Sequence, residues 1–205
     1  MSMSFYRLSF RYNDTYAFRE RPFLTRNQHI HQEIVPDMSG SVNQIASRCK
    51  KCGELLDKQN QSLVGLQISK RKFDISKTYD GIMIASKRFR KSYVDNGLTG
   101  LIFTIIPDDH EFYSMHTTRR VKYDSKQRET EFFDECPFCN QYKSIIGATP
   151  IILMRGESIE DTEFVATDIE FGNDDQKSPL LLCGETCAKV LKQAQLKGVD
   201  LVSCS

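Results

Sequence analysis

The sequence lacks a large excess of charge of either sign. Its 28 Lys and Arg residues nearly balance its 27 Asp and Glu residues, which leaves a formal net charge of +1 at pH 7. Dedicated nucleic-acid binders and membrane-surface binders usually carry a large basic excess, so this balance argues against both classes. A hydrophobic fraction of 40% and a charged fraction of 27% are typical of a folded globular protein.

Long apolar runs are missing as well. No stretch reaches the roughly 20 apolar residues that a membrane-spanning helix needs. The opening residues, Met1 to Arg7, contain no apolar segment of the kind found in a signal peptide. We therefore expect a cytoplasmic protein without a membrane partner.

Signatures of catalysis are also absent from the sequence. It contains no GxSxG, P-loop, HExxH or Rossmann pattern, and no arrangement of carboxylates and histidines that suggests acid–base chemistry. We expect the protein not to be an enzyme.

Seven cysteines are the feature that this composition does not explain. An odd number in a reducing compartment is a poor basis for a disulfide framework. Four of them form two CxxC units, Cys49-Lys-Lys-Cys52 and Cys136-Pro-Phe-Cys139, and each unit can offer two thiolates to one metal ion. Together they make the closed four-sulfur set of a structural zinc site, which leaves no position open for a catalytic water. We expect one structural Zn²⁺ per chain, although Cys52 and Cys136 lie 84 positions apart and meet only through tertiary folding.

Other interpretations of the cysteines remain open. Cys-Pro-Phe-Cys is similar to a glutaredoxin-type redox site, but Pro150 follows Cys139 by only 11 residues, too few for the helix and strand of that fold. The four thiols could also carry no metal. The remaining three cysteines are predicted to fill space as small hydrophobic residues, and they are Cys183, Cys187 and Cys204. His29 and His31 could each replace a ligand, but no neighbouring cysteine or carboxylate cluster supports that role.

An internal similarity organises the rest of the chain. Residues 81–103 align without gaps with residues 179–201, at a constant offset of 98 positions. Each copy predicts a strand, a helix and a strand, with the helix at 87–96 in the first copy and at 187–194 in the second. Ser86 is a helix N-cap, and Gly97 is placed to end the first helix. Chance resemblance between two common amphipathic patterns is the alternative.

The two CxxC units lie 87 positions apart, and one insertion of about 11 residues, near the loop at 172–177, reconciles this offset with the same duplication. We therefore predict an α/β (α+β) fold in a single domain, residues 1–205. It has two pseudo-repeated halves, at about 1–107 and 108–205, each a CxxC turn plus strand-helix-strand. The halves are joined around one structural zinc site. Residues 5–10 predict a further strand, 111–118 and 120–123 predict a hairpin, and 13–32 and 39–44 predict loops.

These residues together resemble the double-CXXCG motif family of bacterial polymorphic-toxin immunity proteins. The resemblance rests on Phe5-Tyr-Arg-Leu8, on both CxxC units and on the closing segment Leu180–Leu201. One residue departs from the pattern, because Asn140 follows the second unit where the family name implies glycine. The resemblance implies a protein that neutralises a cognate bacterial toxin by direct binding, with zinc stabilising its scaffold.

Charge is unevenly distributed along the chain. Residues 70–91 contain eight basic and two acidic side chains, and residues 157–175 contain eight acidic and no basic side chains. Such runs are often only solvated faces, but an acidic segment could also cover the basic active site of a nuclease toxin. The candidate partner-binding residues are Asp161, Glu163, Asp168, Glu170, Asp174 and Asp175. The alternative function is a zinc-ribbon nucleic-acid binder that uses Lys50, Lys51 and residues 70–91; the neutral net charge makes nucleic acid an unexpected partner.

Overall fold

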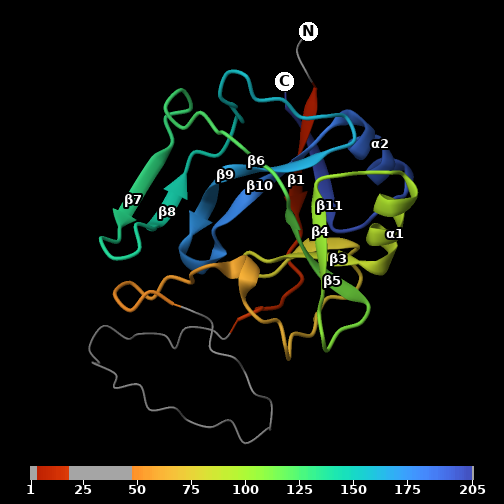
Figure 1. Ribbon diagram of the computed structural model, residues 1–205, viewed down its shortest axis with the longest axis horizontal. Helices are drawn as coiled ribbons and strands as arrows, with labels where there is room; N and C mark the ends of the chain where they lie inside the picture. The colour runs from red at the N-terminus through yellow and green to blue at the C-terminus, as the bar shows by residue number, and fades with distance from the viewer. Residues whose placement is uncertain (1–3, 19–47, 205) are drawn as a thin grey trace, which may run out of the picture.

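The computed structural model describes residues 4–18 and 48–204, and strands predominate among them. The protein is a mixed fold of two sheets and two α-helices in this part of the chain (Figure 1). Residues 19–32 and 39–44 of the predicted loops, together with His29 and His31, lie outside the described residues. The helices gather at one side of the molecule, and a two-stranded hairpin projects at the other (Figure 1).

The larger sheet has seven strands in the order β11-β1-β10-β9-β8-β7, with β6 paired to β9. Its strands are β1 (Phe5–Phe10), β6 (Arg120–Val121), β7 (Glu131–Glu135), β8 (Tyr142–Ile146), β9 (Phe164–Asn173), β10 (Ser178–Cys183) and β11 (Val199–Cys204). The predicted first strand is confirmed, and it runs antiparallel to both β10 and β11. At the centre of the sheet Phe164, Val165 and Ala166 are buried in succession, because both faces of β9 are covered there.

The smaller sheet has four strands in the order β2-β3-β5-β4. They are β2 (Ile75–Lys77), β3 (Met83–Ser86), β4 (Leu101–Ile105) and β5 (Phe112–Thr117). The predicted hairpin at 111–118 and 120–123 is wrong in its pairing, because β5 pairs with β3 and β4 while β6 pairs with β9. The chain crosses between the sheets here: the Thr118 N–H donates to the Gly100 carbonyl, and the Arg119 carbonyl accepts from the Ala166 N–H.

Both predicted helices are present. Helix α1 (Lys87–Asp95) begins after Ser86, whose hydroxyl accepts a hydrogen bond from the Phe89 N–H at 3.2 Å. Gly97 follows with φ of 62°, a left-handed conformation that ends the helix. Helix α2 (Glu185–Gln193) buries Cys187, Val190 and Leu191 on one face, and Ala194 follows the helix half-buried as its C-cap. No helix in the described ranges is long and apolar enough to cross a bilayer.

The two strand-helix-strand segments share one arrangement. In the first segment, β3 and β4 run parallel to each other, and β5 lies between them and is antiparallel to both. In the second segment, β10 and β11 run parallel to each other, and β1 lies between them in the same way. The inserted strand comes from outside the segment in each case. Strand pairing therefore crosses the boundary expected near residue 107, because β1 lies with β10 and β11 while β5 lies with β3 and β4.

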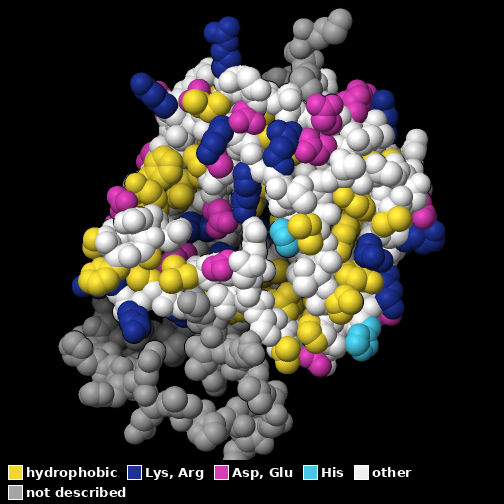
Figure 2. Space-filling model, viewed as in Figure 1, with side chains coloured by type: hydrophobic (Ala, Val, Ile, Leu, Met, Phe, Trp, Pro, Cys, Tyr) yellow, Lys and Arg dark blue, Asp and Glu magenta, His cyan; other side chains and the backbone are white. Residues whose placement is uncertain are grey.

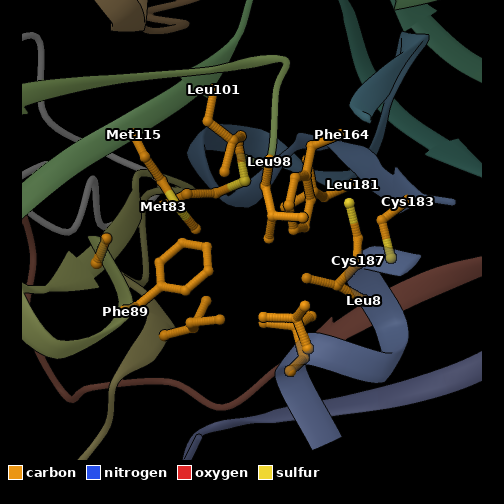
Figure 3. Packing of buried hydrophobic residues seen from close by; sticks show 14 of the residues in the cluster. Leu8, Met83, Phe89, Leu98, Leu101, Met115, Phe164, Leu181, Cys183 and Cys187 are labelled. Atoms are coloured by element: carbon orange, nitrogen blue, oxygen red, sulfur yellow. The ribbon is translucent and has the colours of Figure 1, made fainter. Parts of the chain in front are cut away.

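One hydrophobic cluster joins the two sheets and both helices. It contains Leu8, Met83, Phe89, Phe164 and Cys187, among other buried side chains, and Figure 3 shows these residues turned toward one another. The rings of Phe89 and Phe164 meet edge to face at 6.2 Å.

The cysteines outside the CxxC units take different positions in the fold. Cys183 and Cys187 are buried in the central cluster, as predicted, and burial raises the pKa of both thiols, that of Cys187 to about 12. Cys204 is only half-buried, near the end of β11.

Candidate metal centre

The fold brings the four predicted ligands together. Cys49 and Cys52 lie in a turn that precedes the short 3-10 helix at Lys58–Asn60, and Cys136 and Cys139 lie in the turn between β7 and β8. The Sγ atoms of Cys49 and Cys136 are 3.9 Å apart, those of Cys52 and Cys139 are 3.7 Å apart, and all four lie within 4.8 Å of one another. Tetrahedral coordination with zinc–sulfur bonds of about 2.3 Å places sulfur atoms about 3.8 Å apart. The cluster is therefore compatible with a metal site such as zinc.

The two turns have the same backbone geometry. In the first, the Cys49 N–H donates to Glu54 O at 2.9 Å, and the Gly53 N–H donates to Cys49 O at 2.8 Å. In the second, the Cys136 N–H donates to Gln141 O at 2.9 Å, and the Asn140 N–H donates to Cys136 O at 2.8 Å. Each turn is also closed by an antiparallel strand pairing at equivalent positions, Arg48 with Leu55 and Glu135 with Tyr142.

The residue after each CxxC unit adopts a left-handed conformation. Gly53 has φ of 75° and Asn140 has φ of 55°. Asparagine tolerates this region better than most side chains do, because its short polar side chain can hydrogen-bond locally. The departure from glycine at position 140 therefore leaves the second turn intact.

Backbone N–H groups converge on the first sulfur of each turn. The N–H groups of Cys52 and Lys51 donate to Cys49 and lower the pKa of that thiol to about 6. The N–H groups of Phe138 and Cys139 act in the same way on Cys136 and lower its pKa.

The second sulfur of each turn shows the opposite shift. Desolvation raises the pKa of Cys52 to about 12 and raises that of Cys139 as well. Four thiolates at these distances would repel one another, and a divalent cation among them would offset that repulsion.

Ionic contacts fasten the first turn to the larger sheet. The Arg48 guanidinium donates to Gly53 O at 3.0 Å and pairs with Asp175 at 2.8 Å, just after β9. Farther along, the buried Lys177 ammonium pairs with the buried Glu54 carboxylate at 2.6 Å. The first turn is held by these contacts, while the second turn is held by the pairing of β8 with β9.

The six acidic residues predicted to bind a partner lie along or beside β9, where four of them contact basic side chains of this chain. Their ion pairs are Glu163 with Arg119 at 2.7 Å, Asp168 with Lys122 at 3.3 Å, Glu170 with Arg120 at 3.7 Å and Asp175 with Arg48 at 2.8 Å. Asp161 is exposed before β9, and Asp174 is half-buried with φ of 45°. The four paired carboxylates therefore link distant segments of the chain within the fold.

The basic segment at 70–91 is paired in the same manner. Its ion pairs are Lys70 with Asp14, Arg71 with Asp109, Lys87 with Glu111, Arg88 with Asp74 and Lys91 with Asp95. Lys50 and Lys51 lie in the exposed first turn.

Sequence reasoning missed an exposed apolar surface beside the cysteine cluster. On the β7–β8 hairpin, Phe132, Phe133, Phe138 and Ile146 are all exposed, and Phe138 is 75% accessible. Figure 2 shows hydrophobic side chains over this part of the molecule, at the left of the view. A signal for it was present in Glu131-Phe-Phe-Asp-Glu135, because consecutive residues of a strand point to opposite faces and one of two adjacent phenylalanines must face away from the core.

Comparison with known protein families, curated proteins and solved structures finds no match to this chain.

Proposed function

We propose that Cys49, Cys52, Cys136 and Cys139 hold one Zn²⁺ in a closed structural site. Four sulfur ligands at the spacing of a tetrahedron favour zinc over the hard cations, which prefer oxygen. The redox interpretation uses only the second CxxC unit, and it leaves the approach of the first unit to within 3.9 Å unexplained. A bound zinc would cross-link the turn at 49–52 to the β7–β8 hairpin.

The zinc site in this proposal joins two related halves of the chain. Two observations support a duplication: the CxxC turns share hydrogen bonds, φ values and closing strand pairs at a constant offset of 87 positions. The two strand-helix-strand segments also share the order in which their strands lie. In this interpretation β1 and β5 each complete the sheet of the other half.

The function that follows is binding without catalysis: an immunity protein that neutralises a cognate toxin in the cytoplasm. The observation that carries it is the closed four-cysteine cluster, because four protein ligands leave a tetrahedral ion no free position for a substrate or a water. The resemblance of the cysteine units and chain ends to the toxin-immunity family agrees with this role. The nucleic-acid alternative gains no support from the structure, because five basic residues of the 70–91 segment already form ion pairs within the chain.

Co-expression tests this proposal directly. The product of the gene next to the one that encodes this chain would be induced in a bacterial host, with and without the chain. We expect the neighbouring product to stop growth by itself and the chain to restore it through a complex that co-purifies. Growth arrest that the chain does not relieve, or a harmless neighbouring product, would overturn the immunity function.

A further inference from the structure

Strand β7 forms an exposed edge of the larger sheet. It is the last strand in the sheet order, and all five of its residues are exposed. Within residues 4–18 and 48–204, only β8 pairs with it, so one side of β7 leaves backbone N–H and C=O groups unpaired by another strand. Asp134, with φ of 54°, interrupts the strand, and the regular edge therefore runs from Glu131 to Phe133.

The register of the hairpin divides its apolar side chains between two faces. Phe132 lies opposite Ile145, which is buried in the small cluster with Tyr123 and Phe171. Glu131 lies opposite Ile146 and Phe133 opposite Ser144, so Phe133 and Ile146 share the outer face. Both are more than 40% exposed, an unusual position for a pair of large apolar side chains.

The second cysteine turn carries another exposed apolar side chain. Phe138 lies between two of the ligands, and its backbone N–H donates to the Cys136 sulfur. Within the described ranges, its side chain is nevertheless the most exposed of the large apolar residues, at 75%. The hairpin therefore combines an open strand edge with three outward apolar side chains.

The charge of β7 indicates what kind of partner fits this edge. Its carboxylates, Glu131, Asp134 and Glu135, form no ion pair within the described part of the chain, in contrast to the paired carboxylates along β9. Strand β7 itself carries three carboxylates and no basic residue, while the neighbouring strand β8 carries one, Lys143.

We propose that β7 accepts an extended basic segment of a partner protein as an added strand. Backbone hydrogen bonds to the edge would supply part of the affinity, and apolar side chains of the segment would cover Phe133, Phe138 and Ile146. Lys or Arg residues of the segment would lie beside Glu131 and Glu135, which also speeds association. This inference rests on the proposed function, for which it identifies the docking surface and the partner's chemistry.

A second copy of the same chain does not fit the edge. Pairing of two β7 strands would bring the carboxylates of one copy, Glu131, Asp134 and Glu135, close to the same carboxylates of the other. Like charges directly opposite one another destabilise a strand pair. The same carboxylates that attract a basic strand thus oppose self-association through β7.

A peptide of alternating lysine and valine, about seven residues long, is the probe for this surface. Fluorescence anisotropy would measure its binding to the zinc-loaded protein, and amide hydrogen exchange would locate it. We expect binding with slowed exchange at residues 131–135. We also expect binding about tenfold or more weaker for the matched glutamate–valine peptide and for a lysine–valine peptide with a central proline.

A charge-swap variant supplies the decisive comparison. Glu131→Lys with Glu135→Lys should invert the preference, so that the glutamate–valine peptide binds better than the lysine–valine peptide. The control, Asp95→Lys with Glu160→Lys, changes net charge by the same amount at two exposed residues outside β7 and should keep the original preference. Equal effects of the two variants, or unchanged exchange at residues 131–135 on peptide binding, would overturn the inference.

Growth protection separates this inference from the function on which it rests. If the chain protects against the neighbouring toxin and the charge-swap variant protects equally well, docking at β7 is wrong while the immunity function stands. If the peptide binds at β7 but no toxin is neutralised, the docking surface stands and the immunity function is wrong.

Discussion

The zinc cross-link leads to a prediction that stability experiments can test. Replacing Cys52 and Cys139 by serine removes two of the four ligands at the less buried positions, so the substitutions themselves disturb little packing. The loss of stability should therefore report the loss of the metal. Cys204→Ser is the matched control, because it replaces a half-buried cysteine outside the cluster.

The size of the effect follows from the length of chain that the metal closes. Cys49 and Cys136 are 87 positions apart. A cross-link across a loop of this length lowers the entropy of the unfolded chain by an amount equivalent to about 4–5 kcal/mol at 25 °C. For a chain of this size, that difference corresponds to a decrease in Tm of about 10–20 °C.

Elemental analysis and urea unfolding are the measurements. Wild-type protein and Cys204→Ser should each contain about one zinc per chain and unfold at similar urea concentrations. The double variant should contain no zinc and be less stable, and a chelator should bring the wild type to the same level. A well-folded, zinc-free wild type, or a chelator without effect on unfolding, would refute the reasoning.

Two further predictions concern the scaffold. Gly100→Ala should lower the free energy of unfolding by about 3 kcal/mol, because a Cβ atom there would lie 2.0 Å from Phe164 O. Gly97→Ala should lower it by only about 1–2 kcal/mol through backbone strain, since no atom lies within 4 Å of a Cβ atom at that position. Equal values in urea unfolding would contradict this. The ion pair with Arg119 lowers the pKa of Glu163 below its ordinary value of 4.5, so its stabilisation is present above that value and is lost as pH falls through the folded-state pKa. Glu163→Gln should therefore make the free energy of unfolding less dependent on pH in the acid range, and an unchanged acid profile would show that the pair contributes nothing.

Local features of this protein follow from nearby residues, because their causes act over a few positions. The apolar alternation of residues 5–10 predicts β1, and Ser86 and Gly97 mark where α1 begins and ends, since a cap needs only the first or last turn of a helix. The left-handed backbone after each CxxC unit also has a local cause, because Gly53 and Asn140 both tolerate a positive φ.

Contacts between distant segments depend on the whole fold. Residues 112–117 form a strand by their own pattern, but their partners are β3 and β4, because the chain passes to the other sheet after Thr118. The acidic segment at 157–175 suggests a free charged face. In the fold, however, Glu163 forms an ion pair with Arg119, which lies in the connection between β5 and β6. Neither pairing leaves a periodic signal in the sequence.

The cysteine centre shows both levels at once. The residues from Cys49 to Gly53 and from Cys136 to Asn140 determine the shape of each turn, because every hydrogen bond that closes a turn spans five positions or fewer. Only the tertiary structure decides that the turns meet with sulfur atoms 3.7–3.9 Å apart, and that the second turn leaves Phe138 exposed beside an open strand edge. The two turns are 84 positions apart in the sequence, and the sheets between them set their distance in space. Those sheets form through the burial of apolar side chains along the whole chain, which no local pattern determines.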